Sequence, residues 1–163
     1  MFGLFNKKKQ EDEVVVAPLT GKVIPLSEVP DPVFAQKMMG DGLAIFPSEG
    51  TLVSPVAGKV VQVFPTKHAI GIESSNGTEI LMHIGLETVN MKGEGFEAFV
   101  KEGDTVTKGQ KLISFDIELI KEKAASTVTP VIITNGDAVE ITSKNENQEV
   151  QMGSQTVMTT SKK

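Results

Sequence analysis

The chain has 163 residues, of which 39% are hydrophobic and 23% are charged, a balance typical of one globular domain with its own core. It contains no cysteine, which excludes disulfides and thiol catalysis, and no arginine, which excludes bidentate guanidinium clamps on phosphate. A formal net charge of −5 argues against nucleic acid, and favours a basic protein partner or one that charge does not steer.

Residues 1–13 are expected to form a flexible leader ahead of the folded domain. Their apolar part, Met1 to Phe5, precedes the lysines at 7–9, whereas a secretory signal carries its charges first and a longer apolar run second. No stretch approaches the roughly 20 apolar residues that cross a bilayer. We therefore expect a cytoplasmic protein, with residues 1–9 either unattached or in weak contact with a membrane surface.

From Val14 onward, short apolar runs alternate with turn residues, which predicts many strands and little helix. Strands are expected at 14–19, 43–46, 53–64, 67–73, 78–85, 96–100, 111–115, 127–134, 140–142 and 150–158. Because they recur every 8–12 residues or so, the predicted fold class is all-β: an antiparallel β-sandwich or barrel-like single domain. It covers residues 14–160 and leaves a short tail at 161–163.

Helix is expected in few places. Residues 29–34 are interrupted by Pro30 and Pro32, so they predict a loop with at most a helical turn through Lys37. The one convincing helix is short, about 117–124, and Asp116 is placed to cap its N-terminus.

A short segment of the chain occurs twice in similar form. Ala17-Pro-Leu-Thr-Gly-Lys-Val23 resembles Ser54-Pro-Val-Ala-Gly-Lys-Val60. The similarity predicts two related strand-turn units packed together, as in a fold built by duplication.

The two histidines of the chain, His68 and His83, flank its strongest hairpin signal, Asn76-Gly77. A two-residue turn there would place Ser75 opposite Thr78. The histidines would then be diagonal neighbours on one face, with Cα atoms about 7–8 Å apart. A four-residue loop would put them directly opposite each other, and a three-residue loop would send them to opposite faces.

With the two-residue turn, the face that carries the histidines also carries Thr66, Ile70, Leu81 and Gly85. Apolar surroundings disfavour the charged imidazole, and a histidine nucleophile needs the neutral form with a free lone pair. A second imidazole can donate to a phosphoryl oxygen, and the Thr66 hydroxyl can fix its tautomer. A lone histidine on an apolar strand is more often a core residue, but two that converge favour phosphoryl chemistry.

Two other functions remain open on the residues alone. The histidines and Glu87 could hold zinc as a catalytic set, although an extended strand would carry residue 87 about 13 Å from residue 83. Residues 101–112 resemble a strand-turn segment of biotinyl and lipoyl carrier domains. In such a carrier, Lys92, within Met91-Lys92-Gly93, would be the lysine that bears the prosthetic group.

Several segments match, in the same order, the motifs of one known family: Ala17-Pro-Leu-Thr-Gly21, Val29-Pro-Asp-Pro-Val-Phe-Ala35, Gly40-Asp-Gly42, Thr66-Lys-His-Ala69, Asn76-Gly77, Met82-His-Ile-Gly-Leu-Glu-Thr-Val89, Lys92-Gly-Glu-Gly-Phe96 and Ser126-Thr-Val-Thr-Pro130. On these segments, which span roughly residues 14–160, the chain resembles the glucose-type enzyme IIA of the bacterial phosphoenolpyruvate-dependent sugar phosphotransferase system. The resemblance implies an antiparallel β-sandwich or barrel and the activity of a phosphotransferase component with a phosphohistidine intermediate.

The resemblance also implies roles for single residues. His83 matches the histidine that accepts phosphoryl from the histidine-containing phosphocarrier protein and donates it to a cysteine of an enzyme IIB domain, which drives sugar uptake. His68 matches the histidine that stabilises the phosphoryl group, Thr66 the hydroxyl that orients His68, and Gly85 the carbonyl that binds His83. No metal and no cofactor is implied.

A partner-binding surface is expected around the histidines. Asp31 and Glu87 fall where the family carries acidic residues, and Glu87 departs mildly from the usual aspartate. Apolar and methionine side chains are the candidates for the contact itself: Val33, Phe34, Met38, Met39, Phe64, Ile70 and Leu81. Because the chain has no arginine, a basic partner is expected to supply the positive charge for transfer.

Overall fold

The computed structural model describes residues 12–163. Most of the expected leader, including the expected membrane contact of residues 1–9, lies outside the described residues. Asp12 and Glu13, expected to close the leader, instead pair with Ser161 and Thr160 in a strand ladder. The last strand also runs through Lys162, so most of the expected tail belongs to it. The first strand pairs with the last, and the last also pairs with residues 139–144, so both ends of the described chain belong to one small sheet.

Short antiparallel strands make up most of the described chain. They are β1 (Asp12–Val16), β2 (Gly21–Pro25), β3 (Asp41–Pro47), β4 (Thr51–Val53), β5 (Gly58–Val63), β6 (Ala69–Ser74), β7 (Glu79–His83), β8 (Phe96–Ala98), β9 (Thr105–Val106), β10 (Lys111–Phe115), β11 (Thr129–Ile133), β12 (Val139–Lys144), β13 (Gln148–Val150) and β14 (Thr156–Lys162). Within residues 12–163 they form an eight-stranded sheet, β13-β2-β3-β11-β7-β6-β5-β9, and two three-stranded sheets, β4-β10-β8 and β1-β14-β12. The predicted all-β sandwich is confirmed.

The helices are short. They are the α-helices α2 (Pro32–Ala35) and α3 (Ile117–Lys123) and the 3₁₀-helices η1 (Leu26–Glu28) and η2 (Thr88–Met91). The predicted cap of α3 is present, since the Asp116 carboxylate accepts a hydrogen bond from the Leu119 N–H at 3.1 Å. The helical turn expected near Lys37 is α2, which Asp31 caps in the same way.

The eight-stranded sheet buries apolar residues on both faces. Ile70, Met82 and Val131 belong to the larger core, whereas Leu81 and Ile132, their neighbours along the chain or strand, belong to a smaller cluster. That cluster also contains residues of η1, α2 and the segment between them: Leu26, Val29 and Phe34. Strand alternation therefore leaves the smaller cluster on the outer face of the sheet, beneath the helices.

The two similar segments do pack together, as predicted. The Val16 N–H donates to the Pro55 carbonyl at 3.0 Å, and the Val53 N–H donates to the Pro18 carbonyl at 2.9 Å. In each hydrogen bond, the residue just before one segment donates to the proline of the other segment, so the two segments contact each other in equivalent ways.

The β6–β7 hairpin differs from the prediction. Ala69 pairs with His83 and Glu73 with Glu79, and the Ser74 N–H reaches the Thr78 carbonyl, which leaves a three-residue loop, 75–77. The Asn76 carboxamide oxygen accepts from both the Ser74 hydroxyl and the Thr78 N–H, so its side chain organises a longer turn. The predicted two-residue turn and its register were wrong.

Candidate functional site

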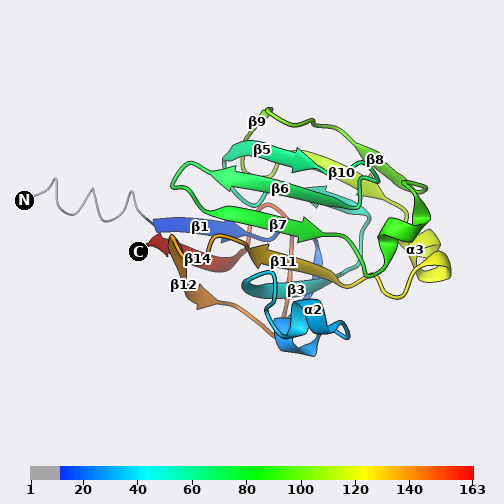
Figure 1. Ribbon diagram of the computed structural model, residues 1–163, viewed down its shortest axis with the longest axis horizontal. Coiled ribbons are helices and arrows are strands. Elements are labelled where there is room, and N and C mark those ends of the chain that lie inside the picture. The colour runs from blue at the N-terminus through cyan, green and yellow to red at the C-terminus, as the bar shows by residue number, and fades with distance from the viewer. Residues whose placement is uncertain (1–11) are drawn as a thin grey trace, which may run out of the picture.

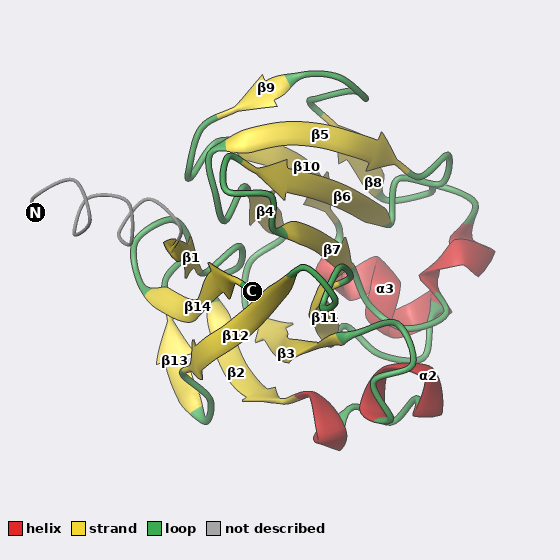
Figure 2. Ribbon diagram, turned by 60° about the vertical axis from the view of Figure 1, so that its left-hand side comes forward, coloured by secondary structure: helices red, strands yellow, loops and turns green. Residues whose placement is uncertain are grey.

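The two histidines meet at one end of the molecule. His83 is the last residue of β7, and His68 immediately precedes β6. This end lies opposite the start of β1 and the end of β14 (Figure 1), and α2 and α3 gather near it (Figure 1, Figure 2).

The backbone at Lys67, not the hairpin register, brings His68 to His83. In a regular strand with the observed register, His68 would share the face of Ile70 and point away from His83. The turn before β6 breaks this alternation, because Lys67 adopts the left-handed conformation at φ 61°. Ring centroids of the histidines consequently lie 4.8 Å apart, edge to face.

Two phenylalanines enclose the imidazole pair. The Phe34 ring lies 5.2 Å from the His83 ring, and the Phe64 ring lies 5.7 Å from the His68 ring, each measured between centroids. His68 is buried, with 4% of its surface exposed, whereas His83 is half-buried. The pair is thus open to an approaching group mainly on the His83 side.

Hydrogen bonds set the outward nitrogen of each ring. The Nδ1–H of His83 donates to the Gly85 carbonyl at 2.8 Å, so the lone pair of the neutral ring is on Nε2. The Thr66 hydroxyl is hydrogen-bonded to Nδ1 of His68. When the hydroxyl donates, Nε2 of His68 carries the proton, and the two rings present an acceptor and a donor.

The loop after β7 is held so that the Gly85 carbonyl faces His83. Gly85 has φ 73°, and a Cβ there would come within 2.7 Å of Thr88 Cγ2 and 2.8 Å of the Ser126 carbonyl oxygen. The Thr88 hydroxyl donates to the Ile84 carbonyl at 2.6 Å, and the Leu86 N–H donates to the Ser126 carbonyl at 2.9 Å. Sequence reasoning missed Thr88 and Ser126, since no local signal marks their role in this loop.

Burial keeps both imidazoles neutral. It lowers the pKa of His68 to about 4, and the neighbouring His83 contributes to the shift. Burial also lowers the pKa of His83, although hydrogen bonds to backbone carbonyls and the negative charge of Asp31 act in the other direction. At neutral pH the site therefore holds two uncharged imidazoles side by side.

The expected partner surface is only partly assembled as predicted. Val33, Met38 and Met39 are exposed on α2 and the segment after it. Phe34, Phe64 and Leu81 lie beneath or beside them in the smaller apolar cluster. Ile70, expected on this face, is wholly buried in the larger core, because the true hairpin register turns it inward.

The two expected acidic residues have different settings. Asp31 is half-buried and caps α2 by accepting from the Val33 N–H at 3.0 Å. Glu87 is exposed and adopts the left-handed conformation at φ 61° just before η2. Within the part of the chain described, no group of three or more His, Asp or Glu is arranged to hold a metal ion, so Glu87 does not complete a three-ligand set with the histidines.

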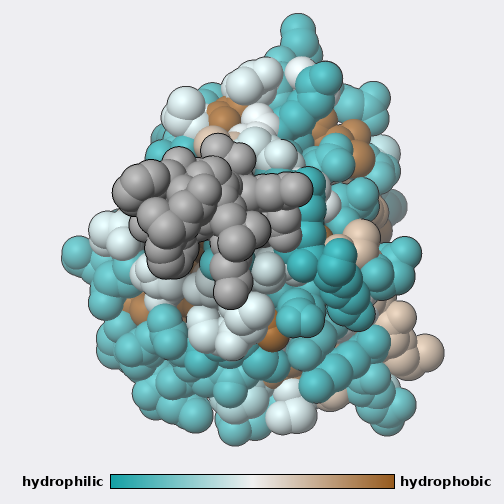
Figure 3. Space-filling model, turned by 90° about the vertical axis from the view of Figure 1, so that its left-hand side faces the viewer, coloured by the Kyte–Doolittle hydropathy of each residue, from teal (hydrophilic) through white to brown (hydrophobic). Residues whose placement is uncertain are grey.

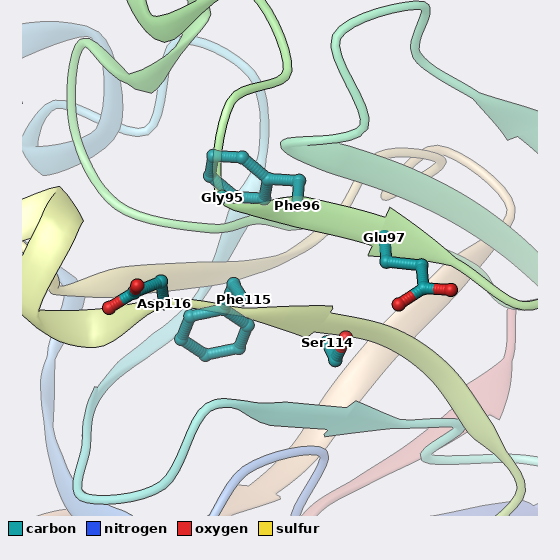
Figure 4. Close-up of a pocket in the computed structure, with 6 residues that line it drawn as sticks. All are labelled: Gly95, Phe96, Glu97, Ser114, Phe115 and Asp116. Atoms are coloured by element: carbon teal, nitrogen blue, oxygen red, sulfur yellow. The ribbon is translucent and has the colours of Figure 1, made fainter.

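Two surface hollows differ in their relation to the histidines. One, of about 230 Å³, is lined in part by Phe64 and Leu81 on the outer face of the eight-stranded sheet. The other, of about 380 Å³, opens between β8, β10 and the start of α3, and none of the predicted site residues lines it (Figure 4).

The far end of the molecule contrasts with the site. On the side where β1 begins and β14 ends, the surface outside the part drawn in grey is largely hydrophilic, with small scattered apolar patches (Figure 3). Among residues 12–163, no helix has the length and apolar character to cross a membrane.

Comparisons with known proteins agree on one family. The family described as "phosphoenolpyruvate-dependent sugar phosphotransferase system, EIIA 1" matches residues 13–139. A "PTS system glucose-specific EIIA component" of Bacillus cereus is 60% identical over 158 residues, which are 97% of this chain and 94% of the relative. The protein of the same name from Halalkalibacterium halodurans is 56% identical over 164 residues, covering 98% of this chain and 95% of the relative. The solved structure "glucose permease IIA from Mycoplasma capricolum" superposes with a TM-score of 0.83 at 42% identity, over 91% of this chain and 95% of that one.

Proposed function

The chain belongs to the EIIA 1 family of the phosphoenolpyruvate-dependent sugar phosphotransferase system, and we propose that Nε2 of His83 is the atom that carries its phosphoryl group. As an EIIA component, the protein transfers phosphoryl through a histidine during sugar uptake. The proposed donor is the histidine-containing phosphocarrier protein, and the proposed acceptor is a cysteine of an enzyme IIB domain.

The observation that carries this assignment is the hydrogen bond from Nδ1–H of His83 to the Gly85 carbonyl. It holds the tautomer whose lone pair is on Nε2, and burial keeps that ring unprotonated. In the first transfer, the Nε2–P bond forms as the P–N bond of the donor phosphohistidine breaks. In the second, the Nε2–P bond breaks as the acceptor thiolate attacks phosphorus.

His68 is proposed to stabilise the phosphoryl group in both transfers. Its ring lies edge to face with His83, and Thr66 acts as the positioning residue that leaves an Nε2–H to donate to a phosphoryl oxygen. Because the chain has no arginine, positive charge for the transition state is proposed to come from the docked partner.

The sugar, the cellular location, the domain bounds and the partner-contact residues are also proposed. The glucose-specific relatives support glucose as the sugar, and an intracellular phosphoryl source supports a cytoplasmic location. The strands from β1 to β14, residues 12–162, would form the carrier domain, and residues 1–9 would make at most a weak contact with a membrane surface. Val33, Met38 and Met39, with Asp31 and Glu87 at the rim, would meet the partner proteins.

Intact mass spectrometry tests the assignment directly. The full chain is incubated with phosphoenolpyruvate, enzyme I and the phosphocarrier protein, beside a His83→Gln variant. Wild type should gain about 80 Da, the mass of one phosphoryl group, in an acid-labile and alkali-stable form. The variant should gain nothing, and a stable phosphate on it would move the assignment to another residue.

A further inference from the structure

The hydrogen bond that orients the His83 ring depends on the conformation of a glycine. Gly85 accepts this bond through its carbonyl and has φ 73°, in the left-handed region. Glycine populates many backbone conformations at little cost, so its own preference does not hold the carbonyl in place. Contacts from the rest of the chain must therefore keep the Gly85 carbonyl directed at Nδ1 of His83.

Two buried threonine hydroxyls hold the peptide group that joins Ile84 to Gly85. At one end, the Thr88 hydroxyl donates to the Ile84 carbonyl at 2.6 Å. At the other end, the Gly85 N–H donates to the Thr129 hydroxyl at 3.4 Å. Both threonines are wholly buried. Because a peptide group is planar, holding its carbonyl and its N–H fixes the rotation of the whole group.

The two hydroxyls reach this peptide group from different elements. Thr129 begins β11, a central strand of the eight-stranded sheet, and its hydroxyl donates to the Thr127 carbonyl at 3.0 Å, which leaves its lone pairs for the Gly85 N–H. Thr88 begins η2, in the loop itself, and its methyl group packs on the glycine, since a Cβ at residue 85 would lie 2.7 Å from Thr88 Cγ2. The sheet and the loop thus hold the same peptide group.

Rotation of that peptide group would move the acceptor of the His83 proton. Only two rotatable bonds, φ and ψ of Gly85, separate the group from the Gly85 carbonyl. In a histidine ring, the hydrogen bond of one nitrogen sets which nitrogen carries the proton. An Nδ1–H that has lost its acceptor no longer holds the proton there, so part of the His83 rings would carry it on Nε2 and lack the proposed nucleophilic lone pair.

We propose that Thr88 and Thr129 are positioning residues for phosphoryl transfer, whose hydroxyls hold the Ile84–Gly85 peptide group so that neutral His83 keeps its proton on Nδ1. The proposal deepens the proposed function and rests on it. Neither threonine contacts the phosphoryl group in this scheme, because both act through the Gly85 carbonyl. The tautomer of His83 is a property of the free protein, so it can be measured without any partner.

Removing each hydroxyl in turn tests the positioning role. Valine has nearly the shape of threonine, so Thr88→Val and Thr129→Val each remove one hydrogen bond to the peptide group with little change in packing. Two-bond ¹H–¹⁵N NMR spectra of the histidine rings at neutral pH show which nitrogen carries the proton. Wild type should show a single Nδ1–H tautomer for His83, and each variant should show a mixture with the Nε2–H tautomer.

Transfer kinetics provide a second measurement. In both valine variants, kcat for phosphorylation by the phosphocarrier protein should fall about 10-fold, as when a residue that orients a functional histidine is lost. KM should stay at the wild-type value, because the surface that meets the partner is unchanged. Thr88→Ser keeps the hydroxyl, so it should retain the Nδ1–H tautomer and most of kcat.

Thr78→Val is the matched control. Thr78 is also wholly buried, and its hydroxyl is hydrogen-bonded to Asn76 and Thr160, each at 2.8 Å, but it lies at the end of the β6–β7 hairpin away from the histidines. By urea unfolding, this variant should lose stability much as Thr88→Val does. Its His83 tautomer and its kcat should match wild type.

The outcomes distinguish the two proposals. If wild type accepts no phosphoryl, the proposed function fails, and the positioning role in transfer fails with it. If wild type is phosphorylated and the valine variants keep a single Nδ1–H tautomer and the wild-type kcat, only the positioning role is refuted. A rise of KM at constant kcat, or an equal tautomer change in Thr78→Val, would also refute it. The valine variants act on opposite ends of one peptide group, so either variant suffices if the other does not fold.

Discussion

The two histidines are chemically different although their rings touch. His83 donates Nδ1–H to a carbonyl that can only accept, whereas Nδ1 of His68 meets a hydroxyl that can donate or accept. The His83 ring is therefore fixed with its lone pair on Nε2, as the proposed nucleophile requires, and the His68 ring is suited to hydrogen-bond the transferred group. This difference predicts that replacing His83 and replacing His68 impair different steps of phosphoryl transfer.

The first prediction concerns His68→Gln. The variant keeps His83 and its bond to Gly85, so it should still accept phosphoryl from the phosphocarrier protein. It should donate to enzyme IIB at least 10-fold more slowly, since the hydrogen bond to the phosphoryl group is lost. Single-turnover transfer from isolated phosphoprotein measures this step, and normal onward transfer would contradict the role of His68.

The second prediction concerns pH. Burial lowers the pKa of His68 from 6.5 to about 4, so between these pH values the unfolded chain binds a proton that the folded chain excludes. Stability should therefore be fully present above pH 6.5 and fall by about 1–3 kcal/mol as the pH drops toward 4. Urea unfolding of wild type and His68→Gln measures it.

The comparison of the two proteins isolates the histidine. Carboxyl groups also titrate in this range, but they are common to both chains, so only the difference between the two stability curves reports His68. Parallel curves from pH 7 to pH 4 would mean that His68 titrates normally.

Among the elements, the turn between β5 and β6 decides whether a site forms at all. The Phe64 N–H donates to the Ala69 carbonyl at 3.0 Å and the Lys67 N–H to the Phe64 carbonyl at 2.7 Å, which closes the turn tightly. Lys67 at φ 61° then places the His68 ring against His83. A lysine in this conformation is strained, whereas glycine adopts it freely.

The third prediction follows from that strain. Lys67→Gly should leave folding stability and phosphoryl transfer near wild type, whereas Lys67→Val should lose about 1–3 kcal/mol of stability and slow onward transfer. Lys59→Val, on the exposed face of β5, is the matched control and should be neutral. Denaturant unfolding and transfer rates measure both effects, and a Lys67→Val protein equal to wild type would show that the turn tolerates another path.

Across the whole molecule, the two similar segments hold corresponding positions. Gly21 and Gly58 each begin a strand, and a Cβ would lie 1.9 Å from the Phe46 carbonyl oxygen at Gly21 and 2.1 Å from the Glu73 carbonyl oxygen at Gly58. Each glycine permits close approach of the neighbouring strand. The repeat therefore preserves a packing requirement as well as a sequence pattern.

The fourth prediction tests this equivalence. Gly21→Ala and Gly58→Ala should each destabilise the protein by about 1–3 kcal/mol, because backbone must move to admit the methyl group. Gly136→Ala, where a Cβ would meet nothing within 4 Å, should change stability by less than about 0.5 kcal/mol. Thermal and urea unfolding of the three variants would show whether only one of the two segments is tightly packed.

The sequence by itself indicated the fold class, most of the strands and the chemical candidates, although it missed β2 (Gly21–Pro25) and β9 (Thr105–Val106). Apolar runs between turn residues predicted the antiparallel sandwich, Asp116 predicted the start of α3, and the repeat predicted two units that pack together. The strands and the helix cap depend on neighbours within a few residues, and the packing of the two units was indicated by their sequence similarity, so pattern along the chain was sufficient. The choice of His68 and His83 came from their rarity and their apolar surroundings, and Thr66 came from its position two residues before His68. The family resemblance added the role of the Gly85 carbonyl.

Only the tertiary structure decided how those candidates meet. The sequence-based argument brought the histidines together through a two-residue turn, and the observed three-residue loop would have separated them. They meet because Lys67 adopts a left-handed conformation in the turn before β6. Gly85 lies in a loop that is held by the nearby Thr88 and by Ser126 from a distant part of the chain. The burial of Ile70 depends on the same register. Side-chain hydrogen bonds within loops and contacts between distant segments set such details, and periodicity along the chain does not encode them.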